Sequence, residues 1–83
     1  MTPEQCRAAR GWLEISQDDL ASAARVSIST VRDFEKARHV PIANNLAAMK
    51  AALETQGIVF VDGGGTYGIT YAKPEKAKRT RVC

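Results

Sequence analysis

"SQDDLASAARVSISTVRDFE", residues 16–35, contains two short helical patterns in close succession. Ser16 is followed by acidic residues, which is typical of an N-cap and a first helical turn, so we expect a helix over about 17–23. Ser27 is the next N-cap candidate and predicts a second helix over about 28–36. The stretch therefore predicts two helices joined by a tight turn.

The second of these helices has one apolar face and an outer face of mixed character. Val31 and Phe34 lie three residues apart and form a stripe that should pack inward. The remaining positions should face outward: Ile28, Ser29, Arg32, Asp33 and Lys36. An isoleucine among outward residues is either one of the scattered apolar side chains of any surface or part of a contact surface.

A further helix should precede this pair. Thr2, Pro3 and Gln5 match a capping box with proline at the first helical position, and the helix should continue to about Trp12. Its inner face should carry three side chains: Cys6, Ala9 and Leu13. Cys6 is interpreted as a small buried residue.

Another helix should follow, after a loop that contains Pro41. The stretch "NNLAAMKAALETQG", residues 44–57, ends in a glycine suited to a C-cap, Gly57. Four apolar residues recur in it at helical spacing: Leu46, Met49, Ala52 and Leu53.

The composition changes at residue 58. "IVFVD" and "YGITY" are rich in β-branched and aromatic residues, and they flank "GGGT", which predicts a hairpin with a flexible, glycine-rich loop. A lone hairpin is marginally stable, and its edges can pair with other strands. We expect a second copy to pair with it in a four-stranded intersubunit sheet; the alternative is a hairpin folded back on the preceding helix with free edges. The expected dimerisation residues are Ile58, Val59, Phe60, Val61, Tyr67, Ile69 and Tyr71.

Charge is unevenly distributed along the chain. The 83 residues carry a net charge of +3, yet residues 1–71 have seven Lys and Arg against eight Asp and Glu. Residues 72–83 carry five bases and one acid, so we expect a disordered basic tail. It either solubilises the chain or strengthens binding to a polyanion. The expected organisation is a helical domain over 1–57, a dimerisation hairpin over 58–71 and the tail.

Length and composition argue against several classes of protein. Eighty-three residues make one small domain, and no apolar run approaches the roughly 18 residues of a membrane span. The first residues lack the pattern of a signal peptide, so we expect a cytoplasmic protein. Cys6, Cys83 and His39 support neither a disulfide framework nor a metal site, and no cofactor is expected. No nucleophile with a plausible base and no phosphate-binding lysine loop is found, so an enzyme is not expected.

The two central helices resemble the helix-turn-helix of the Cro and phage-repressor class, also called the XRE family. The resemblance covers residues 3 to about 56, and its features are Gln17, Leu20, Ala21, Val26, Ser27, Val31 and Glu35. "MTPEQCRAAR" and "GIVFV" are also similar to segments of small bacterial regulators. The resemblance implies a mainly α fold, with a four-helix Cro/repressor-type domain followed by a C-terminal β-hairpin that pairs across a homodimer.

The resemblance also implies roles for individual residues. Arg10 and Glu35 stand where the family often has an internal ion pair, and Gln17 stands where a residue commonly binds phosphate. The helix that starts at Ile28 becomes the recognition helix. The residues implied to contact DNA are Gln17, Ser27, Ile28, Ser29, Thr30, Arg32, Asp33, Lys36 and Arg38, with Lys36 and Arg38 nearer the phosphates.

One position departs from the family pattern. The turn usually has glycine where this chain has Arg25. A non-glycine residue in the left-handed conformation costs roughly 1 kcal/mol. The turn is therefore either strained or built differently.

Together these features predict a transcriptional regulator that binds a palindromic operator on double-stranded DNA as a homodimer. The alternative is a protein-binding helix-turn-helix module, such as an antiactivator or an antitoxin, that acts on another protein. The low net charge of residues 1–71 favours this alternative. The bases Arg32, Lys36 and Arg38, close together in the chain, favour DNA.

Overall fold

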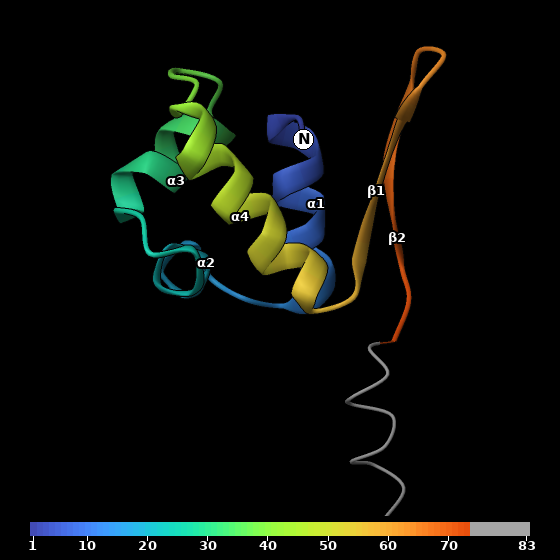
Figure 1. Ribbon diagram of the computed structural model, residues 1–83, viewed down its shortest axis with the longest axis horizontal. Coiled ribbons are helices and arrows are strands. Elements are labelled where there is room, and N and C mark those ends of the chain that lie inside the picture. Colours follow the sequence, from blue (N-terminus) through green and yellow to red (C-terminus); the bar gives the residue numbers. More distant parts are fainter. Residues whose placement is uncertain (74–83) are drawn as a thin grey trace, which may run out of the picture.

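The computed structural model describes residues 1–73; residues 74–83, and with them most of the expected basic tail, lie outside the described part. Four helices are followed by an antiparallel hairpin, so the described chain is mainly helical (Figure 1). The elements are α1 (Pro3–Leu13), α2 (Gln17–Ala24), α3 (Ile28–Glu35), α4 (Ala43–Thr55), β1 (Ile58–Gly63) and β2 (Thr66–Tyr71). Among the described residues, no helix combines the length and apolarity that crossing a membrane requires.

The first three helices start where the sequence predicted. The Thr2 side chain accepts a hydrogen bond from the backbone N–H of Gln5, and the Gln5 side chain accepts one from the Thr2 N–H, which completes a capping box. Ser16 and Asp19 form a second capping box. Ser27 caps α3 by accepting from the N–H of Thr30 at 3.2 Å. These contacts span three residues, so the local sequence determines them.

Helix α4 differs slightly from its expected bounds. It starts one residue earlier, at Ala43, after Ile42 in the N-cap position, which makes no side-chain cap. It ends at Thr55 with Gln56 as the C-cap, and Gly57 follows with φ of 109°. Glycine is therefore the residue after the C-cap, where its tolerance of positive φ lets the chain turn into β1.

One hydrophobic core holds the helices and the base of the hairpin together. Its buried members are Cys6, Ala9, Leu20, Ala21, Ala24, Val31, Phe34, Met49, Leu53 and Ile58. Leu13, Leu46 and Ala52, expected on inner faces, are half-buried at the margin of this core. Because Ile58 belongs to the core, the hairpin is anchored to the helical domain at its first residue.

The hairpin turn is tighter than the expected flexible loop. β1 extends to Gly63 and β2 starts at Thr66, so only Gly64 and Gly65 connect the strands. Their φ angles are 59° and 81°, and positive φ at both central residues is the condition for a two-residue turn that matches strand twist. Glycine meets this condition without steric strain, which explains why "GGGT" forms a tight turn here.

The hairpin packs on helices of its own chain. β1 lies against α4 and β2 against α1, with Phe60 and Ile69 opposite each other in register and packed against the core (Figure 1). In the described chain the sheet has two strands, β1 and β2. The expected dimerisation residues are thus divided: Ile58, Phe60 and Ile69 cover the chain's own helices, whereas Val59, Val61, Tyr67 and Tyr71 are exposed.

Candidate nucleic-acid interface

Helix α3 is oriented by the residues that it buries. Val31 and Phe34 are 0% and 3% exposed, and the side chain of Glu35 is buried beside them. α3 contacts both α2 and α1, so its inner face is fixed from two directions. The face opposite these buried residues therefore points away from α1 and α2.

The residues of α3 that face away from the buried stripe form a surface that we call the outward arc, with a centre and two borders. Successive helical residues are about 100° apart, which puts Ser29 and Lys36 opposite the buried stripe. Both are exposed. Ile28, 38% exposed, and half-buried Arg32 lie on one border, and half-buried Thr30 and Asp33 lie on the other. Ile28 is thus accessible at the edge of the arc, next to Arg32.

Hydroxyl groups cluster at the start of α3. The Ser27 hydroxyl lies 3.2 Å from that of Ser29 and 2.8 Å from that of Thr30. Ser27 also caps the helix, so it and Thr30 are engaged in holding the first turn. Ser29 keeps an exposed hydroxyl at the centre of the arc.

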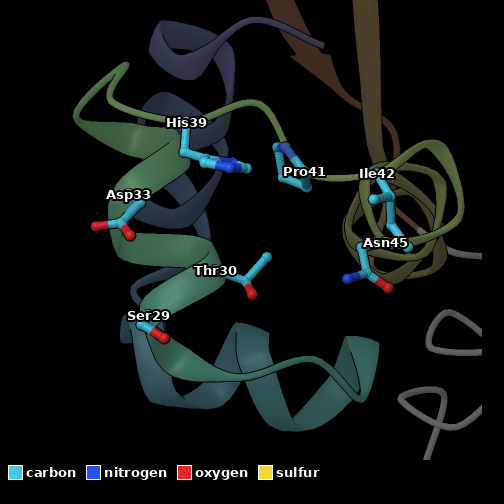
Figure 2. Close-up of a pocket in the computed structure, with 7 residues that line it drawn as sticks. All are labelled: Ser29, Thr30, Asp33, His39, Pro41, Ile42 and Asn45. Carbon is cyan, nitrogen blue, oxygen red and sulfur yellow. The ribbon is translucent and has the colours of Figure 1, made fainter.

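A shallow hollow of about 270 Å³ lies between α3 and the start of α4 (Figure 2). Thr30 on α3 and Asn45 on α4 point toward each other across it. Its remaining lining residues are Ser29, Asp33, His39, Pro41 and Ile42. Val40 and Ile42, in the loop between the two helices, are 71% and 67% exposed. Sequence reasoning did not single out this apolar loop; its signal is the pair of branched residues around Pro41.

The side chains of Arg10 and Glu35 join α1 to α3. Arg10 Nε donates to one Glu35 carboxylate oxygen at 2.7 Å, and Arg10 Nη2 donates to the other at 2.8 Å. Cys6 Sγ lies 3.2 Å from the same carboxylate, and Arg7 donates to the Glu35 backbone carbonyl. Two parallel bonds to a buried carboxylate give a geometrically specific pair. The pair fixes α3 relative to α1.

The electrostatics of this cluster follow from its burial and its hydrogen bonds. Burial alone would raise the pKa of Glu35, but hydrogen bonds from Arg10, Gln17 and Cys6 hold it below its ordinary value. The hydrogen bond to Glu35 raises the pKa of Arg10. Burial, followed by the hydrogen bond to Glu35, raises the pKa of the Cys6 thiol, so this cysteine is a poor nucleophile. Glu35 is thus ionised in the fold.

Gln17, which the resemblance assigned to phosphate, has a partner inside the protein. Its Nε2 donates to Glu35 Oε1 at 3.1 Å, which links α2 to the same cluster. The side chain is half-buried. In this conformation the amide connects the two helices of the motif, and the second N–H of Nε2 is left for another acceptor.

Arg25 adopts φ of 61°, so the left-handed turn residue is confirmed. Glu14 and Ala37, both with φ of 59°, close α1 and the turn after α3 in the same way. Sequence reasoning missed these two, because no glycine or asparagine marks either position. Of the other bases of the motif, Lys36 and Arg38 are exposed, and Arg32 is half-buried.

No protein-family model matches the chain, and no curated protein matches it significantly in sequence.

Proposed function

We propose that this protein is a sequence-specific DNA-binding regulator of the Cro/repressor helix-turn-helix type, which inserts α3 into the major groove. The observation that carries the proposal is an eight-residue helix whose polar arc faces outward while its inner face is fixed by a core and an ion-pair cluster. A rigid helix with its early residues exposed is the element that such proteins place against base edges.

The side chains of the arc suit base recognition. Arg32 can donate two hydrogen bonds to guanine, and the methyl groups of Ile28 can contact the methyl group of thymine. The exposed Ser29 hydroxyl can donate to a base edge or accept from one. Lys36 and Arg38, at the end of the helix and just after it, would contact phosphates and contribute affinity that does not depend on sequence.

Two copies would bind together, acting in the cytoplasm on chromosomal DNA. In the proposed dimer the hairpins pair edge to edge, with exposed Val59 and Val61 contributing apolar surface. Two-fold symmetry would then require a palindromic operator with half-sites about 34–36 Å apart. Binding near a promoter would regulate transcription by blocking or recruiting polymerase.

A protein-binding module is the second candidate, and one observation favours it. Val40 and Ile42 form an exposed apolar loop beside α3. A loop that contacts DNA would instead be expected to carry basic residues, which bind phosphate. A partner protein that contacts this loop would use the same side of the molecule as DNA.

Selection of bound fragments from random duplex DNA tests the proposal. We expect palindromes with half-sites one helical turn apart, and no enrichment with a variant that carries both Ile28→Ala and Arg32→Ala. Circular dichroism must show that the variant is folded, and Lys50→Ala, which removes a base on α4, serves as the matched control. Absence of any enriched sequence with the natural protein would reject the DNA proposal in favour of a protein partner.

A further inference from the structure

The Gln5 side chain is buried and bonded to three backbone groups. It is 2% exposed, and its Oε1 accepts from the Thr2 N–H at 2.7 Å as part of the α1 cap. Its Nε2 donates to the carbonyl of Val61 at 2.9 Å and to the carbonyl of Gly68 at 2.9 Å. Val61 and Gly68 are register partners on β1 and β2. One amide group therefore holds both strands of the hairpin against the first turn of α1.

These two bonds give the hairpin a second anchor. The first is Ile58, which is buried in the core. Val61 is three residues further along β1, or roughly 10 Å in an extended strand. Beyond this point the hairpin continues past the start of α1 (Figure 1). Phe60 and Ile69 also pack against the core, so apolar contacts hold the hairpin on the helices, and the two bonds from Gln5 fix its angle to the first turn of α1.

The direction of the hairpin matters if two hairpins join the dimer. α1 is tied to α3 through Arg10 and Glu35, so a rotation of the hairpin relative to α1 would shift α3 relative to its copy. A six-residue strand is roughly 20 Å long. A rotation of about 10° over this length moves its end by about 3.5 Å, close to one base-pair step of about 3.4 Å.

We infer that Gln5 is a positioning residue that determines which operator half-site spacing the dimer accepts, by fixing the hairpin to α1 through both strands. This inference rests on the proposed function. It requires the hairpin to join the copies and α3 to bind DNA, but it does not require Gln5 to touch DNA.

A pair of substitutions separates this role from the helix cap. Gln5→Glu keeps the side-chain length and an oxygen for the Thr2 N–H, but it removes both donors to the strands. Thr2→Val is the matched control, because it removes the hydroxyl that accepts from the Gln5 N–H and leaves the side-chain amide of Gln5 intact. If Gln5→Glu does not fold, as judged by circular dichroism, Gln5→Met takes its place, since it has similar length and neither donor nor charge.

The first measurement is binding to palindromes whose half-site separation is changed by one or two base pairs. The natural protein and Thr2→Val should lose roughly tenfold in affinity for each base pair added or removed, and Gln5→Glu should lose about threefold or less. Retention of the natural spacing dependence by Gln5→Glu and Gln5→Met would overturn the inference. A merely structural role would weaken binding at every spacing equally.

The second measurement needs no DNA. Spin labels placed at Asp62→Cys and Ser22→Cys, in a Cys83→Ser background diluted with unlabelled protein, report the distance between the hairpin and α2. We expect a narrow distribution for the natural residue and for Thr2→Val, and a broad one for Gln5→Glu. An unchanged distribution would overturn the inference even if DNA binding holds. A natural protein that binds no DNA would instead reject the proposed function.

Discussion

Three residues without special backbone tolerance hold left-handed conformations at or just after the ends of α1, α2 and α3. They are Glu14, Arg25 and Ala37, with φ of 59°, 61° and 59°. Each carries a Cβ that crowds the backbone in this conformation, at a cost of roughly 1 kcal/mol relative to glycine. The core and the caps around them determine the direction of the chain, so the strain persists.

Arg25→Gly should therefore stabilise the protein. Arg25 is exposed, and removal of its Cβ relieves the strain, so we expect the melting temperature to rise by a few degrees for a gain near 1 kcal/mol. The control is Ala23→Gly, an exposed position inside α2, which should lower it by a similar amount. Equal losses for both variants would show that residue 25 is not left-handed in solution.

Acid should destabilise the protein through Glu35. The pKa of this carboxyl in the folded state lies below its ordinary value of 4.5, so folding favours the ionised form. The stabilisation is present above pH 4.5 and is lost as the pH falls through the folded-state pKa. Urea unfolding from pH 6 to pH 3 should show a smaller loss for Glu35→Gln than for the natural protein. A parallel loss in both would assign the acid sensitivity to other carboxyls.

Removing one partner of the Arg10–Glu35 pair should cost more stability than removing both. Arg10→Met leaves a buried carboxylate with weaker partners, and we expect it to cost about 3 kcal/mol or more. The double variant Arg10→Met, Glu35→Leu removes the buried charge as well and should recover part of the loss. Equilibrium denaturation of the natural protein, both single variants and the double variant measures this coupling.

At the scale of elements, the features that depend on neighbouring residues, such as helix starts, were predicted best from the sequence. The starts of α1, α2 and α3 follow from Thr2, Ser16 and Ser27, whose capping contacts lie within three residues. The hairpin followed from two β-branched runs around glycines. Its tight turn was not predicted, because "GGGT" alone does not reveal that Gly63 and Thr66 pair.

Contacts between distant elements could not be predicted in the same way. Gln5 was predicted as a capping residue, but its bonds to the hairpin join positions 56 and 63 residues apart. The resemblance assigned Gln17 to phosphate, and it did not reveal that the Gln17 amide also donates to Glu35, 18 residues away. A glutamine that binds an external group and a glutamine that bonds to a distant part of its own chain look the same in the sequence. Only the packing of the elements identifies its partner.

Substitutions on α3 should distinguish side chains that recognise the DNA sequence from side chains that add affinity for any DNA. Ile28→Ala and Arg32→Ala should each cost roughly 1 to 3 kcal/mol on the preferred operator and relax its sequence preference. Lys36→Ala should weaken all sequences about equally and reduce the salt dependence by about one unit. Binding titrations at several salt concentrations, on the selected operator and on random DNA, measure both effects. Equal losses on both DNAs for Arg32→Ala would make it a phosphate contact.

At the scale of the whole molecule, the distribution of exposed apolar residues favours one surface for the second copy that we propose. Val59 and Val61, on the hairpin, are 48% and 38% exposed, and Val40, beside α3, is 71% exposed. Only the first pair lies on the element whose edges can extend a sheet. The two surfaces lie on different elements of the fold, so separate variants of each surface can distinguish them.

The proposed dimer should therefore be disrupted by charge on the hairpin and should tolerate charge beside α3. A variant with Val59→Lys and Val61→Lys would bring like charges together across the proposed two-fold axis. We therefore expect it to sediment as a monomer at concentrations where we expect the natural protein to be a dimer. Its affinity for a full palindrome should fall by roughly a hundredfold, because the second half-site is no longer held at high effective concentration. Val40→Lys is the control, since it adds a charge at an exposed valine outside the hairpin and should remain a dimer. A dimeric hairpin variant together with a monomeric Val40→Lys would place the interface on the loop before α4, where it would compete with DNA for the side of the molecule that carries α3.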